Sequence, residues 1–275
     1  MNGCEFADAL RAGRRVYGTL VVAPAPEWPP AVLQTGIDFV FIDTEHIALD
    51  RSRVSWMCRT YSALNLAPIV RIPCPDPCQA AMMLDAGAAG IVAPYVESAE
   101  EARRLVGAVK FSPLKGRRLA GVLGGRDPLG SSLGDHLAAA NRCSTAIVNI
   151  ESVPAVDRLE EILAVRGLDA VLIGPHDLSI SMGIPRQYDD PRFIEVVDSI
   201  IARARGAGLA AGMHAMFPEA LPHEVRMAKA GANLFIHQAD ILAFRLAVKA
   251  DLDALRHALG DPPAGKAGTA LPDAV

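Results

Sequence analysis

The hydrophobic pattern of the chain alternates between two kinds of segment. Short and nearly continuous apolar runs occur at 16–22, 38–43, 67–71, 90–93, 145–151, 169–173, 209–213 and 233–236. Continuous runs of this length are typical of parallel strands that are covered on both faces. Segments with helical periodicity lie between them, at about 50–64, 76–86, 98–109, 154–165, 191–206, 218–229 and 240–259.

The joints between these segments repeat one layout. The stretches DAGAAGIV, VRGLDAVLI and KAGANLFI each combine the end of a helix, a glycine and a buried strand. Eight strands alternating with helices predict a (β/α)8 TIM barrel, and a doubly wound open sheet is the alternative. No linker divides the chain, so we expect a single catalytic domain over residues 1–259.

Two segments fall outside this alternation. Residues 112–135 are long and glycine-rich, which predicts an active-site loop or lid. Residues 260–275 are rich in Pro, Gly and Ala without any period, which predicts a disordered C-terminal tail.

Composition narrows the class of protein. The 275 residues carry a net charge of −4, and 51% of them are hydrophobic. This excludes disorder of the whole chain and argues against a nucleic-acid partner. No secretory signal or membrane span is visible, so we expect a cytoplasmic protein without a membrane partner. The five cysteines are odd in number and irregularly spaced, which predicts reduced thiols.

Candidate chemistry lies where the predicted strands end. The second strand ends in Asp43-Thr44-Glu45-His46, the third in Arg71, the fifth in Asn149-Ile150-Glu151-Ser152, and the sixth runs into Gly174-Pro175-His176-Asp177. In a barrel, the carboxyl ends of all strands meet at one mouth, where active sites lie. We therefore expect these side chains to share one site.

Two carboxylates in this set have the spacing of a metal site. Glu151 and Asp177 are separated by one strand–helix repeat and would end neighbouring strands. Hard oxygen donors with room for water and substrate favour Mg²⁺ or Mn²⁺. The alternative is that Glu151 caps the following helix and Asp177 caps a short turn.

The basic residues at the strand ends suggest further roles. His46 is a candidate general base or a structural hydrogen bonder. Arg71 would hold a carboxylate or a developing oxyanion, and a salt bridge to Glu45 or Asp43 is compatible with that role. His214 and His237 follow late strands and could line the pocket. No lysine ends a predicted strand, which argues against a Schiff-base mechanism and for metal-assisted chemistry.

Several of these motifs together resemble the HpcH/HpaI family of class II, pyruvate-dependent aldolases. They are FIDTEH (41–46), IVRI (69–72), LDAGAAGIVAPYVESAEEAR (84–103), VNIES (148–152) and IGPHDLS (173–179), and the likeness extends from about residue 16 to 245. The resemblance implies a barrel of the phosphoenolpyruvate/pyruvate-binding type.

The resemblance also implies roles for individual residues. Metal ligands for Mg²⁺ or Mn²⁺, with Co²⁺ as a further option, would be Glu151 and Asp177. Arg71 would stabilise the enolate and its carboxylate, His46 would be the general base, and Asp85 would raise the basicity of that histidine. Substrate contacts would come from Arg71, Asn149, Gly174, Pro175, His176 and Asp177.

The position of Asp85 bears on the oligomeric state. Because Asp85 precedes a strand, it could reach a histidine only across a subunit interface. The family resemblance implies a homo-oligomer, commonly a hexamer. The amphipathic stripe of 240–259 would suit such a contact.

This chain departs from the family pattern at four places. Asn149 stands where glutamine is common, Leu119 replaces the last glycine of a Gly-x-Arg-Gly loop, His176 is bulkier than the usual residue, and the ending Ile236-His237-Gln238-Ala239-Asp240 is not glycine-rich. These departures affect the identity of the substrate more than the metal or enolate chemistry.

The sequence therefore predicts a divalent-metal-dependent aldolase. It would reversibly cleave a 4-hydroxy-2-oxo acid to pyruvate and an aldehyde through a metal-bound pyruvate enolate. A citrate-lyase-like acyl-CoA lyase and a non-catalytic small-molecule-binding barrel are the alternatives.

Overall fold

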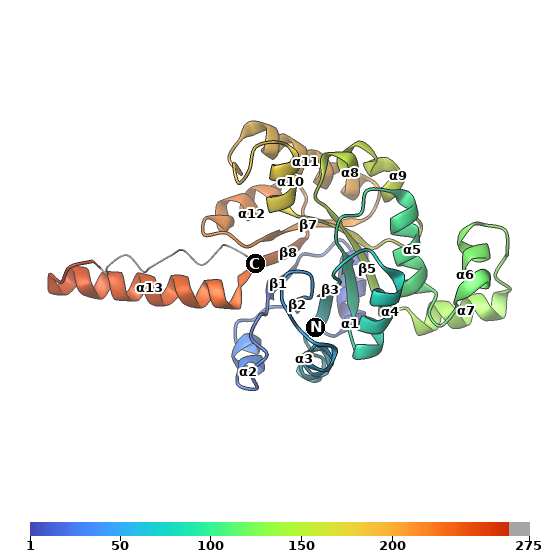
Figure 1. Ribbon diagram of the computed structural model, residues 1–275, viewed down its shortest axis with the longest axis horizontal. Coiled ribbons are helices and arrows are strands. Elements are labelled where there is room, and N and C mark those ends of the chain that lie inside the picture. The colour runs from blue at the N-terminus through green and yellow to red at the C-terminus, as the bar shows by residue number, and fades with distance from the viewer. Residues whose placement is uncertain (264–275) are drawn as a thin grey trace.

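A computed structural model describes residues 1–263, and its centre is a closed barrel of eight parallel strands in chain order (Figure 1). The strands are β1 Val16–Leu20, β2 Phe39–Asp43, β3 Ala67–Arg71, β4 Gly90–Ala93, β5 Thr145–Ile150, β6 Ala170–Ile173, β7 Ala210–Ala215 and β8 Leu234–Ala239. The prediction of a (β/α)8 barrel is confirmed, and the open sheet is excluded because β1 pairs with β8.

Side chains alternate between the inside and the outside of the barrel along each strand. Phe39 and Phe41 of β2 belong to an inner apolar cluster, whereas Val40 and Ile42 pack outward against the helices. Towards the carboxyl ends the interior changes from apolar to polar. The buried polar side chains at this end include Asp43, Arg71, Asn149, Glu151 and His214. The polar layer forms the bottom of the barrel mouth.

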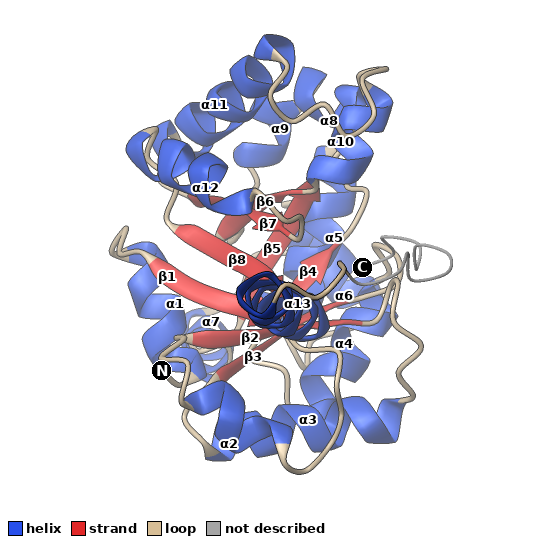
Figure 2. Ribbon diagram, turned by 90° about the vertical axis from the view of Figure 1, so that its left-hand side faces the viewer, coloured by secondary structure: helices blue, strands red, loops and turns tan. Residues whose placement is uncertain are grey.

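Each helical segment predicted from the sequence is present. The helices are α3 Arg51–Ala63, α4 Pro77–Ala86, α5 Ala99–Lys110, α8 Val153–Asp157, α9 Leu159–Leu163, α11 Pro191–Gly206, α12 Ala220–Lys229 and α13 Asp240–Leu259. Several begin at a side chain that accepts a backbone hydrogen bond, as Asp50, Asp76, Ser98 and Asp190 do. The helices surround the strands in Figure 2. This capping chemistry explains why their beginnings could be predicted closely.

Five short helices were not predicted, namely α1 Gly3–Arg11, α2 Trp28–Leu33, α6 Gly116–Leu123, α7 Ser131–Ala140 and α10 Pro175–Ser181. The prediction of a lid over 112–135 is wrong. This segment forms α6 and the first half of α7, which project from the side of the barrel (Figure 1). Because it follows a helix and precedes β5, it lies at the amino end of the barrel, away from the mouth.

The last helix, α13, leaves the barrel instead of packing on it. It projects outward in Figure 1 and is seen end-on in front of the strands in Figure 2. Asp240 is its only buried residue, and this carboxylate accepts hydrogen bonds from the backbone amides of Val22 and Ala23. No helix within residues 1–263 is long and apolar enough to cross a membrane. The predicted disordered tail over 260–275 falls mostly outside the described residues.

The expectation of uniformly reduced thiols is wrong in this structure. Cys4 and Cys143 form a disulfide across 139 residues of sequence. The pair forms because α1 packs under the barrel next to the segment that enters β5, and this proximity leaves no local signal in the spacing of the cysteines. Cys58, Cys74 and Cys78 are free.

Candidate active site

An arginine and an aspartate form the most deeply buried charged pair of the mouth. Arg71 donates from Nε to Asp43 Oδ1 at 2.8 Å and from Nη2 to Oδ2 at 2.6 Å. Strand register sets this contact, because Asp43 and Arg71 are direct partners across β2 and β3. Burial opposes ionisation of Asp43, but the hydrogen bonds and charge of Arg71 hold its pKa below the ordinary value.

Asp43 also organises the turn that follows β2. Its carboxylate accepts hydrogen bonds from the backbone amides of Glu45 and His46. Glu45 Oε2 lies 3.2 Å from Arg71 Nε and 3.7 Å from His46 Nε2. That oxygen has no hydrogen-bond partner among the described residues, because the Nε–H of Arg71 points at Asp43. Burial raises the pKa of Glu45 to about 7, against the opposing charge of Arg71.

A second cluster at the same mouth contains the two predicted metal ligands. Tyr95 contacts both of them, donating from its amide to Glu151 Oε1 at 2.6 Å and from its hydroxyl to Asp177 Oδ1 at 3.1 Å. Asn149 donates to Glu151 Oε2 at 2.9 Å. A Cβ on Gly174 would collide with Glu151 Oε2, so only glycine leaves room for this carboxylate. Glu151 and Asp177 therefore share Tyr95 as a neighbour, and the charge of Asp177 acts on Glu151.

The capping alternative for the two carboxylates is wrong. Ser152, not Glu151, caps α8 and accepts a hydrogen bond from the amide of Ala155. Gly174 occupies the N-cap position of α10, and Asp177 lies in the first turn with its carboxylate bonded to Tyr95. Neither acid is used to cap a helix.

The electrostatics of this cluster suit a divalent cation. Burial raises the pKa of Glu151 to about 7, and the nearby charges of Glu45 and Asp177 act in the same direction. Buried carboxylates that repel one another are stabilised by a bound cation, and oxygen donors favour Mg²⁺ or Mn²⁺. No set of three or more His, Cys, Asp or Glu residues suitable for a metal occurs within residues 1–263. A cation bound by Glu151 and Asp177 alone would keep its remaining coordination positions for water and substrate.

Other predicted site residues lie elsewhere or face outward. Asp85 is exposed in the last turn of α4, at the amino end of the barrel and far from the mouth of its own chain. His176 is exposed on α10. His237 faces outward on β8, where it pairs with Glu224 and does not line the pocket. His214 does point inward, and its ring stacks on that of Phe41 at 6.4 Å.

Sequence reasoning missed Tyr95, which links the two carboxylates. It follows β4, and its backbone φ of 47° is unusual for a residue other than glycine. The tyrosine lies at a strand end, which was the available signal, but an aromatic residue there did not suggest a polar contact. Asp43 was considered as one of two partners for Arg71, and the structure shows contacts to both Asp43 and Glu45.

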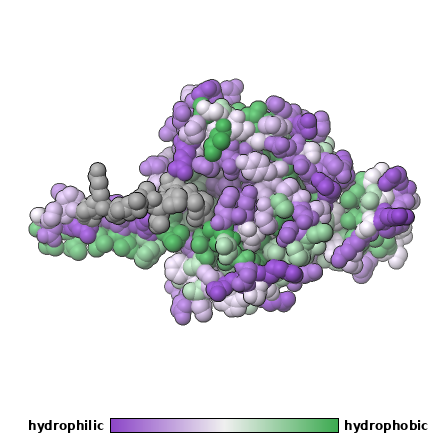
Figure 3. All heavy atoms as spheres, viewed as in Figure 1, coloured by the Kyte–Doolittle hydropathy of each residue, from purple (hydrophilic) through white to green (hydrophobic). Residues whose placement is uncertain are grey.

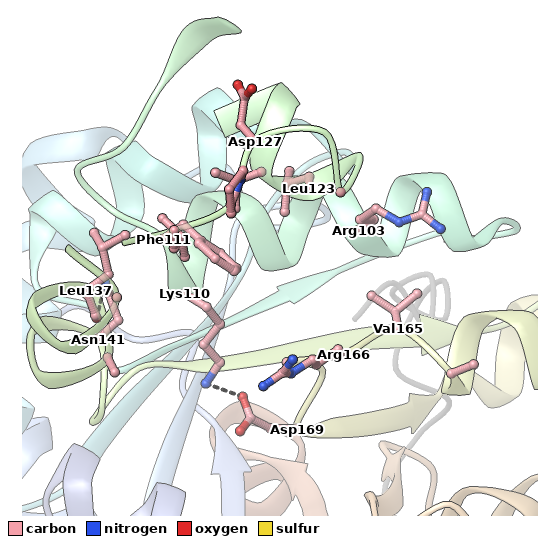
Figure 4. Close-up of a pocket in the computed structure, with 18 of the residues that line it drawn as sticks. Arg103, Lys110, Phe111, Leu123, Asp127, Leu137, Asn141, Val165, Arg166 and Asp169 are labelled. Atoms are coloured by element: carbon pink, nitrogen blue, oxygen red, sulfur yellow. Dashed lines mark hydrogen bonds and ion pairs between the residues drawn. The ribbon is translucent and has the colours of Figure 1, made fainter. Parts of the chain in front are cut away.

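A separate pocket of about 930 Å³ lies at the other end of the barrel, between α5, the α6–α7 segment and the start of β6 (Figure 4). Lys110 extends into it and pairs with Asp169 at 2.5 Å. Burial lowers the pKa of Lys110, although Asp169 opposes this change. Lys110 is therefore paired at the amino end of the barrel, and it does not reach the mouth. This agrees with the absence of a lysine at the end of any predicted strand.

The fold and the mouth together define a barrel enzyme whose site combines a buried arginine with paired carboxylates. The profile of the HpcH/HpaI aldolase/citrate lyase family matches residues 26–235. The chain belongs to this family and is a carbon–carbon lyase of the aldolase type.

Named relatives and a solved structure support this assignment. The chain is 35% identical over 211 residues to the hydroxypyruvate/pyruvate aldolase of Roseovarius nubinhibens, covering 77% of this chain and 82% of the relative. It is 31% identical over 213 residues to the 2-keto-3-deoxy-L-rhamnonate aldolase of Salmonella gallinarum, covering 78% and 79%. A HpcH/HpaI family protein from Burkholderia cenocepacia J2315 has a TM-score of 0.78 at 28% identity, covering 92% of this chain and 99% of that one.

Proposed function

We propose that this enzyme is a divalent-metal-dependent aldolase that cleaves 4-hydroxy-2-oxo acids to pyruvate and an aldehyde, and that also runs in reverse. The observation that carries the proposal is the contact of Tyr95 with both Glu151 and Asp177, together with the charges of Asp177 and Arg71 that act on Glu151. The names of the two relatives, which are aldolases of pyruvate or 2-keto acids, support the same reaction class.

Glu151 and Asp177 would hold Mg²⁺ or Mn²⁺, which supplies Lewis-acid polarisation of the 2-oxo group when bound. Asn149 and Tyr95 keep the Glu151 carboxylate in one orientation through hydrogen bonds to its two oxygens. This arrangement limits the conformational freedom that would otherwise be lost on binding. At the start of α10, the backbone amide of His176 would be the donor for the substrate carboxylate, because Pro175 has no N–H and the amide of Gly174 donates to the carbonyl of Ile150.

Arg71 stabilises the negative charge that develops on the substrate. Its guanidinium is buried, and Asp43 fixes its orientation through two hydrogen bonds. A preoriented cation in a site with little water stabilises an enolate strongly. Because Asp43 already orients the guanidinium, the arginine needs little reorganisation during the reaction.

His46 takes the proton from the 4-hydroxyl group, directly or through one water. The C3–C4 bond then breaks, the aldehyde forms, and the electron pair moves into the C2–C3 unit of the pyruvate enolate. A proton delivered to C3 completes pyruvate. Glu45, whose Oε2 lies 3.7 Å from His46 Nε2, stabilises the imidazolium between these two steps.

We also propose that the enzyme is a homo-oligomer in which α13 packs against another copy. The apolar residues of α13 that are exposed form one stripe, namely Ile241, Phe244, Val248, Leu252, Leu255 and Leu259. Figure 3 shows apolar side chains along the lower edge of this helix. A stripe of this length on an unpacked helix is typical of a subunit contact. A second copy would also be needed for the exposed Asp85 to approach a mouth.

The reaction is tested by condensation of pyruvate with an aldehyde panel in the presence of Mg²⁺ or Mn²⁺, with the 4-hydroxy-2-oxo acid measured by chromatography. We expect product with metal, none after chelation, and none from Glu151→Gln. Activity that survives in Glu151→Gln under chelation would contradict the proposal. Turnover of an acyl-CoA thioester without aldol product would favour the citrate-lyase-like alternative.

A further inference from the structure

The pocket between α5, the α6–α7 segment and the start of β6 has a polar floor built around Asp169. The Oδ2 atom of Asp169 accepts a hydrogen bond from the amide of Ala146 at 2.8 Å and pairs with Lys110 Nζ at 2.5 Å, and Oδ1 lies 3.6 Å from Arg11 Nη2. Lys110 also donates to the carbonyl of Ser144. These contacts join α1, α5 and the starts of β5 and β6. Because the charges of the floor are engaged with one another, they fix its shape rather than bind a ligand.

The other walls of the pocket are mainly apolar. Phe111, Leu123 and Leu137 come from the segment between α5 and β5, and Val165 comes from the turn after α9 (Figure 4). Phe111 and Leu123 are only half-buried, so apolar surface faces the cavity. The volume of about 930 Å³ is in the range of pockets that enclose a small organic molecule. A ligand that fills this cavity needs an apolar body to match these walls.

Two arginines at the rim of the pocket have guanidinium groups without a partner. Arg103 pairs with Glu100 at 2.5 Å, but neither Arg142 nor Arg166 makes a side-chain hydrogen bond or ion pair within residues 1–263. Arg11 Nη2 donates to the carbonyl of Arg142 at 3.1 Å and so holds its main chain. Figure 4 shows the side chain of Arg166 extending towards the polar floor. A free guanidinium presents a planar set of donors that matches a carboxylate or a phosphate.

The acidic side chains of the pocket leave a basic excess. Asp169 belongs to the floor, and Asp127 lies 3.6 Å from Arg118. Glu161 is the remaining acid of the lining, and it makes no ion pair in the described part of the chain. Set against the two unpaired arginines, this acid leaves an excess of positive charge, although the whole chain has a net charge of −4. A small local excess of this kind favours a monoanion over a dianion.

We propose that this pocket binds an organic monoanion in which a carboxylate is joined to an apolar body, such as an aryl-substituted acid. Arg142 and Arg166 hold the carboxylate at the rim, and the apolar body lies against Phe111, Leu123 and Leu137. The site is at the end of the barrel opposite the mouth, so it is a second binding site. The inference does not depend on the aldolase reaction.

Two compounds of the same shape test whether an anion is recognised. Ligand-observed NMR titrations of the full-length protein compare 4-phenylbutanoate with 4-phenylbutanamide, which is uncharged. We expect 4-phenylbutanoate to bind with a dissociation constant of about 1 mM or lower, as a ligand of this size does in a formed pocket. The amide should bind about tenfold more weakly, because it lacks the charge-assisted hydrogen bonds. Absence of 4-phenylbutanoate binding, or equal binding of the two compounds, would overturn the inference.

Variants assign the anion to the two arginines. Arg142→Ala and Arg166→Ala should each weaken binding of 4-phenylbutanoate about tenfold and leave binding of 4-phenylbutanamide nearly unchanged. Arg117→Ala, which alters an exposed arginine of α6 outside the pocket lining, is the matched control and should change neither. Thermal melting checks that each variant is folded, and Arg→Gln at the same position serves where Ala fails to fold. Unchanged binding of 4-phenylbutanoate in a folded variant with both arginines replaced would overturn the site.

Two further measurements separate this pocket from the mouth and a carboxylate from a phosphate. Glu151→Gln alters the mouth and should bind 4-phenylbutanoate as the wild type does, whereas loss of binding in that variant would place the ligand in the mouth and overturn the inference. 3-Phenylpropyl phosphate has the same apolar body with a dianionic group. It should bind no more tightly than 4-phenylbutanoate, and tighter binding would overturn the assignment of a monoanion.

Discussion

Arg71 and Asp43 show how a single contact supports both stability and the proposed chemistry. Both side chains are almost fully buried, and the two hydrogen bonds satisfy the aspartate while aiming the guanidinium into the mouth. Removing one partner of such a pair leaves a buried charge uncompensated, which costs about 3–5 kcal/mol. A substitution that keeps the positive charge of Arg71 but changes the shape of the side chain is also expected to weaken this contact, because the two hydrogen bonds depend on the planar guanidinium.

Arg71→Lys is expected to lower kcat/KM for aldol cleavage at least ~100-fold, because an ammonium group cannot make the two parallel hydrogen bonds to Asp43. Steady-state kinetics and thermal melting measure the effect. Arg192→Lys is a matched control, since Arg192 makes a similar two-bond contact to Asp190 on the exposed surface. An Arg71→Lys variant as active as the wild type would argue against the proposed role.

His214 gives a prediction for stability against pH. Because its pKa is lowered in the folded state, the unfolded chain binds a proton more readily below about pH 6.5, and stability falls as the pH falls from there towards the folded pKa of about 3. His214→Leu should reduce the loss of unfolding free energy between about pH 7 and pH 4.5 by about 2 kcal/mol. Urea titrations at the two pH values measure this, and an equal acid dependence in both proteins would contradict the assigned burial effect.

Among individual residues, the sequence predicted those groups whose position follows from the ends of strands. Arg71, Glu151 and His46 were expected at one mouth because parallel strands place their carboxyl ends together, and their catalytic roles stay predictions. Tyr95 was not found, because its role depends on an unusual backbone conformation and on two contacts made by different atoms. The choice of Asp43 as the two-bond partner depends on strand register, which the sequence does not specify.

Among the helices and strands, continuous apolar runs located the strands well, since both faces of each strand are buried. The segment 112–135 was misjudged because its glycines suggested a loop. Gly107 of α5 instead leaves space for Leu123 of α6, where an added Cβ would lie 2.6 Å from the leucine Cδ1. The order of elements along the chain could have excluded a lid over 112–135, because a segment between a helix and the next strand lies at the amino end of the barrel, opposite the mouth.

The apolar stripe of α13 predicts an effect on assembly. Leu252→Glu should shift the protein towards smaller species, because it places a charge in the proposed subunit contact. Light scattering after size-exclusion chromatography measures the mass. Ala250→Glu, on the opposite side of the same helix, should leave the mass unchanged. A wild type that is monomeric at all concentrations would contradict the proposed contact.

For the protein as a whole, metal binding should be linked to stability and pH. Burial raises the pKa values of Glu45 and Glu151 to about 7, so their ionisation destabilises the folded protein as the pH rises from about 4.5 to 7. Mn²⁺ should offset the part that comes from Glu151 by binding its ionised carboxylate together with that of Asp177, stabilising the fold by about 2.7 kcal/mol at about 100 times its dissociation constant.

Thermal melts of chelated and Mn²⁺-loaded protein at about pH 5.5 and pH 7.5 check this linkage. The increase in melting temperature should be larger at the higher pH and absent in Glu151→Gln. A similar increase in that variant would show that the ion binds elsewhere.

Formation of the pyruvate enolate is the step for which Glu151 and Asp177 are proposed to be essential, and proton exchange measures it without any aldehyde. The C3 proton signal of pyruvate is followed by NMR in D₂O with Mg²⁺ or Mn²⁺, compared with chelated enzyme and with Glu151→Gln and Asp177→Asn. We expect enzyme-dependent exchange with metal and exchange at the buffer rate in the other three samples. Exchange that persists in both variants, or is absent from the metal-loaded wild type, would contradict the proposed role of the two carboxylates.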